Sequence, residues 1–455
     1  MAIHVLLFYQ VALLALVPFL TLYLSGWIVP FSPTADRFCL RNCTSVVVPT
    51  SRTGQHILST EVTSGSVKRA DQVASASSVN NRMDDIMSAM SNGSFNRDSA
   101  ELERSVVKGK QTLSKYQQRE VGSVISLYEN GRFLKEIKKE DTVAIDSSRV
   151  DISLIAIGSL NRVFVASIFS TRWDGPIVFV FYLKKEEEAE FQSLLLRPEN
   201  AILCTPRIRI IAYVVSEGCF FYTNYPINIL RNIGIRNTHT THFIVLDMDM
   251  WMGKNSYQQL LSLPHEVLDS YKTTVVIPAF FHTGWPIVNG TFEEQVNSVR
   301  DKIPFTMDEL LKCYAEKRCS FQKKNLFTHL YVPTKWINDK TKGVYVDYYN
   351  YTCWKNYLQE PYLLVRRNDS LTAFHEAFIN YGFNKISFVE MLRREEYRFV
   401  LAGKVFAFDL PHLPSRYQKS HATNTKSGNY LTNYYYTQGL LKRTKNHTHI
   451  LPLCK

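Results

Sequence analysis

Between residues 150 and 249, short apolar segments alternate with segments whose apolar residues recur at helical spacing. The short segments are typical of strands buried on both faces, and they cover 150–158, 176–183, 208–215 and 242–246. The intervening segments predict helices over 161–173, 186–196 and 226–237. This alternation predicts an α/β fold with a mostly parallel central sheet and helices on both faces. No GxGxxG motif follows the first strand and no Walker A motif occurs, which disfavours a dinucleotide-binding fold or an ATPase.

The pattern continues less regularly after residue 249. We expect strands over 273–280, 360–367 and 399–410, and helices over 256–263, 306–317 and 378–392. Thr306 and Glu309 form a capping box at the start of the second of these helices. Residues 320–360 are rich in aromatic side chains and irregular, and the pattern places no element in the tail, 416–455.

Two carboxylates, Asp247 and Asp249, directly follow the apolar segment 242–246. Open α/β sheets bind ligands at the carboxyl ends of their strands. Residues two apart in an extended segment point to the same side, so both carboxylates are expected to face one point. A cation between them would relieve their repulsion, and oxygen ligands suit Mg²⁺ or Mn²⁺. The alternative is a solvated turn at the end of a strand.

The N-terminal part predicts membrane anchoring. Residues 5–29 carry no charged side chain and are long enough to span a bilayer, which leaves 1–4 as a short cytoplasmic tail. Residues 30–149 are expected to be a stem, partly disordered, with a helix or two between 99 and 140. The folded domain is then 150–455.

Orientation signals conflict. Arg37 and Arg41 follow the apolar segment, which weakly favours a cytoplasmic C-terminus. Against this, Asn-x-Ser/Thr sequons, typical of a lumenal domain, occur at Asn42, Asn92, Asn289, Asn350, Asn368 and Asn446. The eight cysteines contain no CxxC pair. Cys313 and Cys319 are close enough to close a loop, and Cys39 and Cys43 are candidates for linking two stems into a homodimer.

The formal net charge is +12, yet no Lys/Arg run of the nucleic-acid-binding type occurs. We therefore expect no nucleic-acid partner. The charge agrees with a phosphate-bearing or acidic ligand, and equally with an ordinary basic surface.

Several local motifs occur in a fixed order along the chain: Trp173-Asp174-Gly175-Pro176, Tyr225 to Asn232, the Asp247 to Asp249 turn, Val276 to Phe280, Glu360-Pro361-Tyr362 with Arg366-Arg367, Tyr381 to Lys385, and Leu410 to Ser415. In this order they resemble glycosyltransferase family 49, over about 161–415. The resemblance implies a GT-A fold, Mn²⁺ dependence and inverting transfer from a UDP-sugar, of the UDP-glucuronate or UDP-GlcNAc type, to a glycan acceptor. It also implies a single-pass type II protein of the Golgi membrane with a lumenal catalytic domain.

The resemblance also suggests site residues. Asp247 and Asp249 are expected to hold the metal, and a His near the C-terminal end, here His412, is expected to complete its shell. Some relatives carry His at the position of Asp409, so either residue is a candidate. Glu376 is the first candidate for the base that deprotonates the acceptor, and Glu360 is the alternative.

Three further residues are candidates for nucleotide contacts. Asn228 and Arg231 lie one helical turn apart, and Lys385 is able to neutralise phosphate charge. Alternatively, Asn228 and Arg231 belong to a capped, surface-paired helix and Lys385 lies in a solvated loop. The competing functions are a membrane-anchored pseudo-transferase that binds glycan without turnover and a metal-dependent phosphohydrolase. The latter usually needs more acidic and His ligands than the single acidic pair here.

Overall fold

The computed structural model describes residues 120–322, 327–368, 373–413 and 428–454. The predicted cytoplasmic tail, the apolar segment 5–29 and the stem up to residue 119, with Cys39 and Cys43, lie outside these residues. Within the part of the chain that is described, none of the helices is both long and apolar enough to cross a membrane.

The described residues form two sheets. The larger has ten strands in the order β11-β13-β8-β12-β6-β3-β4-β5-β1-β2. In chain order these are β1 (Ser123–Glu129), β2 (Arg132–Ile137), β3 (Ile152–Ser159), β4 (Ile177–Lys184), β5 (Ile208–Val215), β6 (His242–Asp247), β8 (Thr273–Ile277), β11 (Tyr348–Asn350), β12 (Tyr362–Arg366) and β13 (Arg398–Ala402). The smaller sheet has the order β10-β9-β14-β7, formed by β7 (Met250–Met252), β9 (Ala279–His282), β10 (Cys319–Ser320) and β14 (Ala407–Asp409).

The centre of the larger sheet is the predicted parallel unit. Strands β6, β3, β4 and β5 lie side by side and run parallel, and β4 is buried from Ile177 to Leu183. Apart from β13, which runs parallel to β8, the rest of the sheet departs from the prediction. Strand β12 is antiparallel to both of its neighbours, β6 and β8, and β1 is antiparallel to β5. The sheet is therefore mixed rather than mostly parallel, a difference that apolar periodicity does not encode because a buried strand has the same pattern in either direction.

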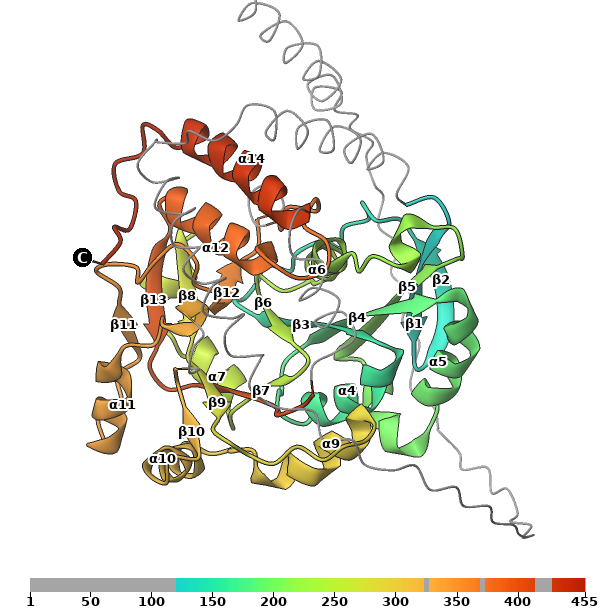
Figure 1. The fold of residues 1–455 in the computed structure, drawn as a ribbon, viewed down its shortest axis with the longest axis horizontal. Coiled ribbons are helices and arrows are strands. Elements are labelled where there is room, and N and C mark those ends of the chain that lie inside the picture. The colour runs from blue at the N-terminus through green and yellow to red at the C-terminus, as the bar shows by residue number, and fades with distance from the viewer. Residues whose placement is uncertain (1–119, 323–326, 369–372, 414–427, 455) are drawn as a thin grey trace, which may run out of the picture. The chain divides into compact units, whose positions relative to one another are not determined.

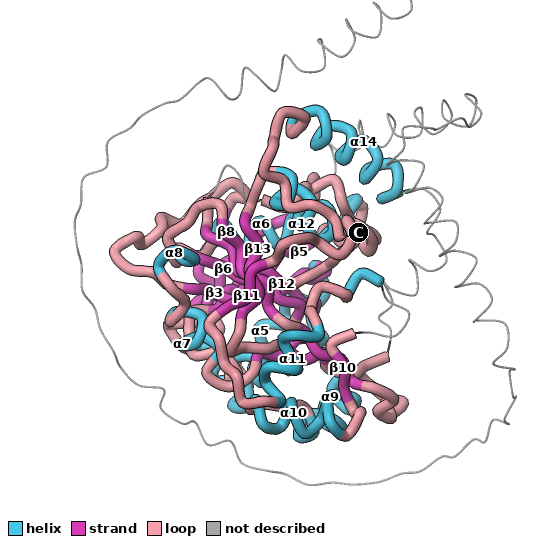
Figure 2. The backbone as a smooth tube through the Cα atoms, turned by 90° about the vertical axis from the view of Figure 1, so that its left-hand side faces the viewer, coloured by secondary structure: helices cyan, strands magenta, loops and turns pink. Residues whose placement is uncertain are grey.

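Helices surround the strands, with α14 at one end of the domain and α10 at the other (Figures 1 and 2). The α-helices are α4 (Val163–Ser170), α5 (Glu188–Leu195), α6 (Ile227–Arg236), α7 (Ser256–Leu261), α8 (His265–Leu268), α9 (Phe292–Val299), α10 (Met307–Ala315), α11 (Thr334–Thr341), α12 (Asn384–Arg394) and α14 (Gly428–Arg443). Helix α6 packs on β3 and β4, and α12 packs against α14. The predicted capping box is present at α10, where the Thr306 side chain accepts from the Glu309 N–H.

The folded domain begins earlier than the sequence predicts. In place of a helix within 99–140, its described part forms the hairpin β1–β2, and β1 pairs with β5. The hairpin turns at Asn130 and Gly131, both with positive φ, and an Asn-Gly pair is a strong hairpin signal. The exposed, Lys- and Glu-bearing strand β2 resembles a solvated helix face in sequence, which hides this signal.

Pro278 divides the predicted strand 273–280 into two. Strand β8 lies in the larger sheet and β9 in the smaller one, and the Pro278 carbonyl between them accepts from the Ala407 N–H at 2.8 Å. Similarly, 399–410 forms β13 and β14 in different sheets. These two crossings place the smaller sheet beside the carboxyl end of β6, because β6 leads directly into β7.

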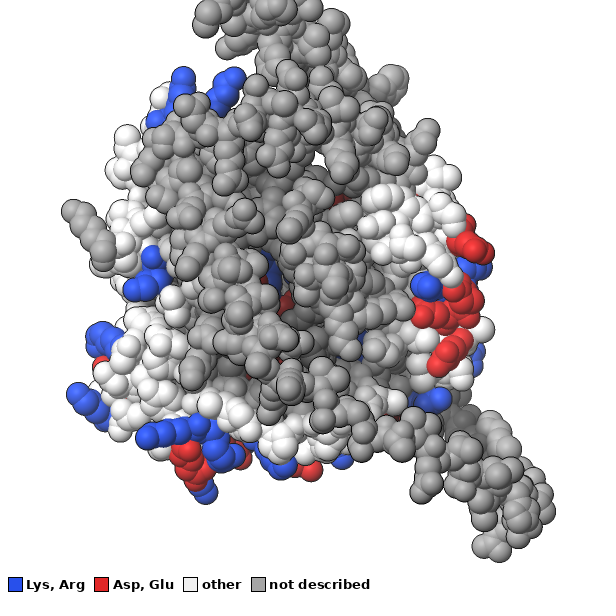
Figure 3. All heavy atoms as spheres, in the orientation of Figure 1, with Lys and Arg blue, Asp and Glu red and all other residues white. Residues whose placement is uncertain are grey.

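Charges of both signs lie next to one another on the described surface. At the lower and right-hand margins of the face in Figure 3, Lys and Arg side chains lie beside Asp and Glu side chains. Although the chain has a net charge of +12, the visible described parts of this face carry acidic side chains among the basic ones.

Candidate functional site

The candidate site lies where β6 ends and the two sheets meet. Asp247 is the last residue of β6, and Asp249 precedes β7. Strand β14 pairs with β7, and the Leu410 N–H donates to the Asp249 carbonyl at 2.7 Å. This pairing brings the segment after β14 back to the acidic pair, although it is remote in sequence.

His412 contacts Asp249 directly. Its Nε2 lies 2.9 Å from Asp249 Oδ2, and its Nδ1–H donates to the Leu413 carbonyl at 2.7 Å. Burial raises the pKa of Asp249, but the hydrogen bond and charge of His412 outweigh burial, so the net pKa is well below its ordinary value. The two ring nitrogens thus have separate partners, with Nδ1 facing the backbone and Nε2 facing the carboxylate.

Asp247 has a different set of partners. Its Oδ2 accepts from Lys385 Nζ and from the Tyr362 hydroxyl, both at 2.8 Å, and its Oδ1 lies 3.7 Å from Arg231 Nη2. Burial raises the pKa of Asp247, and the charges of Lys385 and then Arg231 lower it further than burial raises it. The pKa of Lys385 is raised, because Asp247 and Glu360 outweigh the lowering by burial. The acidic pair is therefore not one symmetric cluster.

Helix α6 places Arg231 beside Asp247. Arg231 is buried, and its Nη1 donates to Asn228 Oδ1 and to Asn384 Oδ1, both at 2.9 Å. Asn228 is fully buried and donates to the His375 carbonyl at 2.9 Å. These contacts use both ends of the Asn228 amide within the protein, and they hold Arg231 beside Asp247.

The two candidate bases lie in different surroundings. Glu360 lies two residues before β12, with Oε2 3.9 Å from Lys385 Nζ, and burial raises its pKa. Glu376 accepts from Asn232 Nδ2 at 3.0 Å and forms ion pairs with Lys139 and Arg236 at 3.4 and 3.5 Å. Glu360 is thus grouped with Asp247, whereas Glu376 ties the chain before β3 to α6.

Asp409 is the last residue of β14 and pairs with Met250 across the smaller sheet. Burial raises the pKa of the Tyr331 hydroxyl, and the negative charges of Glu360, Asp409 and Asp247 raise it further. The His412 imidazole lies 2.9 Å from the Asp249 carboxylate.

Sequence reasoning missed two residues of this region. Tyr362 is buried and donates to Asp247, and Lys385 lies over its ring at 4.6 Å from the centroid. Arg162 follows β3. Burial lowers the pKa of its guanidinium, and the negative charge of Asp249 is the largest effect that opposes this. Tyr362 lies in the Glu360-Pro361-Tyr362 motif, which was a signal for it. For Arg162 the signal was its place after a buried strand.

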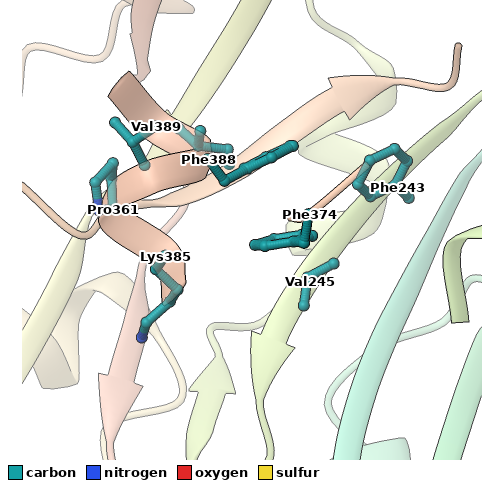
Figure 4. A pocket seen from close by; sticks show the side chains of 8 residues that line it. Phe243, Val245, Pro361, Phe374, Lys385, Phe388 and Val389 are labelled. Atoms are coloured by element: carbon teal, nitrogen blue, oxygen red, sulfur yellow. The ribbon is translucent and has the colours of Figure 1, made fainter. Parts of the chain in front are cut away.

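An apolar cavity lies behind Lys385. It is a partly open pocket lined by Phe243, Val245, Pro361, Leu363, Phe374, Lys385, Phe388 and Val389. In Figure 4 the Lys385 amine is directed away from the rings of Phe243 and Phe388. These apolar side chains lower the local polarity on one side of Lys385, which strengthens its attraction to Asp247.

The donor atoms of Asp249 and His412 suit a divalent metal ion whose remaining ligands would come from a bound substrate and water. Among the described residues there is no group of three or more His, Cys, Asp or Glu side chains placed to hold a metal ion. Asp249 and His412 nevertheless present one carboxylate and one imidazole at 2.9 Å from each other. Mg²⁺, which is bound by only one or two carboxylates in many nucleotide sites, takes its other ligands from water and substrate phosphates.

Comparison with known sequences identifies the chain as a relative of the family 49 glycosyltransferases. A family profile described as "Glycosyl-transferase for dystroglycan" matches residues 216–438. The xylosyl- and glucuronyltransferase LARGE2s of Gallus gallus is 28% identical over 273 residues, which cover 58% of this chain and 32% of that protein. The xylosyl- and glucuronyltransferase LARGE1 of Homo sapiens is 24% identical over 274 residues, covering 60% and 32%. The chain thus spans about a third of the length of these relatives.

Two solved structures align less closely. The crystal structure of GalNAc-T7 with UDP, GalNAc and Mn²⁺ has a TM-score of 0.35 and 11% identity, covering 59% of this chain and 45% of that one. The crystal structure of S. aureus TarS 1-349 has a TM-score of 0.30 and 11% identity, covering 57% and 60%.

Proposed function

We propose that this relative of the family 49 glycosyltransferases is itself a metal-dependent, inverting transferase of the GT-A type. It moves a sugar from a UDP-sugar, of the UDP-glucuronate or UDP-GlcNAc type, to a glycan acceptor. The observation that carries the proposal is the contact of Asp249 with His412 beside the charge-paired Asp247, at the carboxyl end of a central parallel strand. Ligands of open α/β sheets bind at this edge.

Asp249 and His412 would hold Mn²⁺ or Mg²⁺. When bound, such an ion supplies Lewis-acid stabilisation of the charge that develops on the departing diphosphate. We assign Asp247 a different part, because Lys385 and Tyr362 already bond it. Asp247 holds the Lys385 ammonium in a fixed position, and Lys385 adds positive charge beside the donor phosphates.

We propose Glu360 rather than Glu376 as the base that takes the proton from the acceptor hydroxyl. Burial raises the pKa of Glu360, and a carboxylate with a raised pKa is a more effective proton acceptor. Glu376 is instead engaged by Asn232, Lys139 and Arg236. Arg231 orients Asp247 from α6, and Asn228 holds Arg231 in place. Because both side chains are buried, we propose that they support the nucleotide pocket from behind rather than line it.

We also propose that the protein is a single-pass type II protein of the Golgi membrane, anchored by residues 5–29. Two features support a lumenal domain. Asn289, Asn350 and Asn446, which are sequon asparagines, are exposed, and the disulfides Cys313–Cys319 and Cys353–Cys454 are suited to an oxidising compartment.

The test is UDP release by the full-length purified chain, measured over a panel of UDP-sugars with Mn²⁺, with EDTA, and for Asp249→Asn. We expect one donor to be turned over, only with metal, and the variant to lose at least about 100-fold in rate. Arg132→Gln, an exposed change on the edge strand β2, is the matched control and should retain wild-type rates.

If no UDP-sugar is turned over and UDP with Mn²⁺ does not raise the melting temperature, the transferase proposal is wrong. Turnover that persists in EDTA would instead remove the metal from the proposal and leave the transfer reaction in place.

A further inference from the structure

Arg162 packs against residues that flank the acidic pair. It ends the 3₁₀ turn Leu160–Arg162 directly after β3. Its guanidinium carbon lies 3.4 Å from the ring centroid of Phe292, on α9, and the same ring is 5.6 Å from the His412 ring. At Gly158, an added Cβ would lie 2.8 Å from Arg162 Cβ and 2.9 Å from Met248 Cε, so the absence of a side chain there lets Arg162 pack closely.

One nitrogen of this side chain lacks a partner. Nη1 of Arg162 is shielded from solvent and has no hydrogen-bond partner among the described residues. The strongest charge acting on the guanidinium is that of Asp249, and Asp247 also acts on it, yet the described residues show no ion pair from Arg162 to either carboxylate. A buried, charged donor without a partner is unfavourable and is usually explained by a ligand or water that completes it.

The position of Arg162 in the sheet indicates what kind of group would accept a hydrogen bond from it. Strands β3 and β6 are adjacent and parallel, and Ile157 on β3 is level with Asp247 on β6. Arg162 therefore lies on the β3 side of the acidic pair, whereas Lys385 contacts Asp247 from α12. An anion bound at Asp249 and His412 through a shared metal would have one fixed cation on each side.

We propose that Arg162 binds the diphosphate of the nucleotide donor and stabilises it as it leaves, with Phe292 positioning the guanidinium. The proposal deepens the proposed function and rests on it. The planar guanidinium makes charge-assisted hydrogen bonds to phosphate oxygens, often two at once. Because the side chain is already fixed by packing, little ordering is needed when the donor binds.

The experiment measures binding rather than turnover. UDP, UMP and uridine are titrated calorimetrically, with Mn²⁺, into the full-length wild type, Arg162→Gln, Arg162→Met and the exposed control Arg132→Gln. Arg162→Met keeps a long apolar stem for packing on Phe292, and it decides the question if the Gln variant does not fold.

We expect the Arg162 variants to bind UDP about 10- to 100-fold more weakly, the cost of losing hydrogen bonds to a charged group. Uridine binding should be unchanged, and Arg132→Gln should match the wild type. Unchanged UDP affinity in folded Arg162 variants, or an equal loss for uridine, would overturn this inference alone. Absence of UDP binding by the wild type would overturn the proposed function and this inference together.

Discussion

Asp247 and Asp249 are two residues apart, but their carboxylates differ in what neutralises them. Lys385 and Arg231 neutralise Asp247 with fixed side-chain charges, whereas Asp249 has the titratable His412. An imidazole that donates through Nδ1 to a backbone carbonyl is a suitable metal ligand through Nε2. Under the proposed function, Asp249 is therefore the carboxylate that would exchange its partner for a metal, whereas Asp247 would lose Lys385 if it did so.

The two glutamates give a prediction at this scale. Glu360→Gln should lower kcat by about 100-fold or more, since the amide cannot accept the acceptor proton, and leave UDP affinity within about 2-fold of wild type. Glu376→Gln should instead leave kcat near wild type and lower the melting temperature, because it breaks the ion pairs to Lys139 and Arg236. Kinetics and thermal melts of both variants check this. Equal kcat for Glu360→Gln and wild type would remove Glu360 as the base.

Local sequence revealed the acidic pair but not most of its partners. Asp247 and Asp249 follow a buried strand, which is a local pattern. The contacts of Asp247 with Tyr362 and Lys385 span 115 and 138 residues, and that of Asp249 with His412 spans 163. Such pairs depend on the strand order in the sheets, which local periodicity does not specify. His412 and Lys385 were found through motif resemblance, and Arg162 lies outside those motifs.

At the scale of elements, hydrophobic periodicity predicted the strands that hold the site. The parallel direction was correct for β3, β4, β5 and β6 but wrong for β12. The predicted strand 208–215 has the same bounds as β5. A short, continuous apolar run of this length is typical of a strand buried on both faces. The direction of β12 depends on its long preceding connection. The hairpin β1–β2 was missed because the Asn130-Gly131 turn lies between a half-buried strand and an exposed one.

Helix α6 depends on a glycine for its approach to the sheet. A Cβ at Gly234 would lie 2.3 Å from Ile155 Cγ2 of β3. Gly234→Ala should gain about 1 kcal/mol in helix propensity but lose about 1–3 kcal/mol to overpacking, so we expect net destabilisation. Gly439→Ala, in α14 with nothing within 4 Å of the added atom, should stabilise by about 0.5–1 kcal/mol. Denaturant titration measures both. Stabilisation by both changes would mean that α6 moves freely away from β3.

His242 connects the start of β6 to α8, because its Nε2 donates to the Leu268 carbonyl at 2.9 Å. Burial lowers the pKa of His242 to about 4, whereas the unfolded chain titrates near its ordinary value of about 6.5. Between these values the unfolded state binds a proton that the folded state does not. The free energy of unfolding should therefore fall as pH drops from about 6.5 to 4, by up to about 3 kcal/mol.

This stabilisation is complete above about pH 6.5. Denaturant titrations at several pH values should show a smaller loss in His242→Gln than in the wild type. His265→Gln, at a side chain 94% exposed on α8, is the control and should keep the wild-type loss. An unchanged pH dependence in His242→Gln would assign it to other groups.

At the scale of the whole molecule, the C-terminal end is fastened to the larger sheet. Cys454 forms a disulfide with Cys353 across a sequence separation of 101. The flanking backbone pairs as well, since the Trp354 N–H donates to the Pro452 carbonyl at 2.7 Å and the Cys454 N–H donates to the Trp354 carbonyl at 2.8 Å. The Trp354 side chain is buried against Phe399 of β13. The chain after α14 is thus held against the segment that follows β11, beside β13.

The two disulfides allow a test of how this closure contributes to stability. In the chain-entropy account, a cross-link stabilises by restricting the unfolded chain, and the effect grows with the logarithm of loop length. Removing Cys353–Cys454 should then cost about 4.7 kcal/mol, and removing Cys313–Cys319, with a separation of 6, about 2.4 kcal/mol. Denaturant titration of the two double Ala variants measures the difference. If the short-loop variant loses as much stability as the long-loop variant, native-state packing around the buried Cys313 and Cys319, rather than loop closure, determines the contribution of these cross-links.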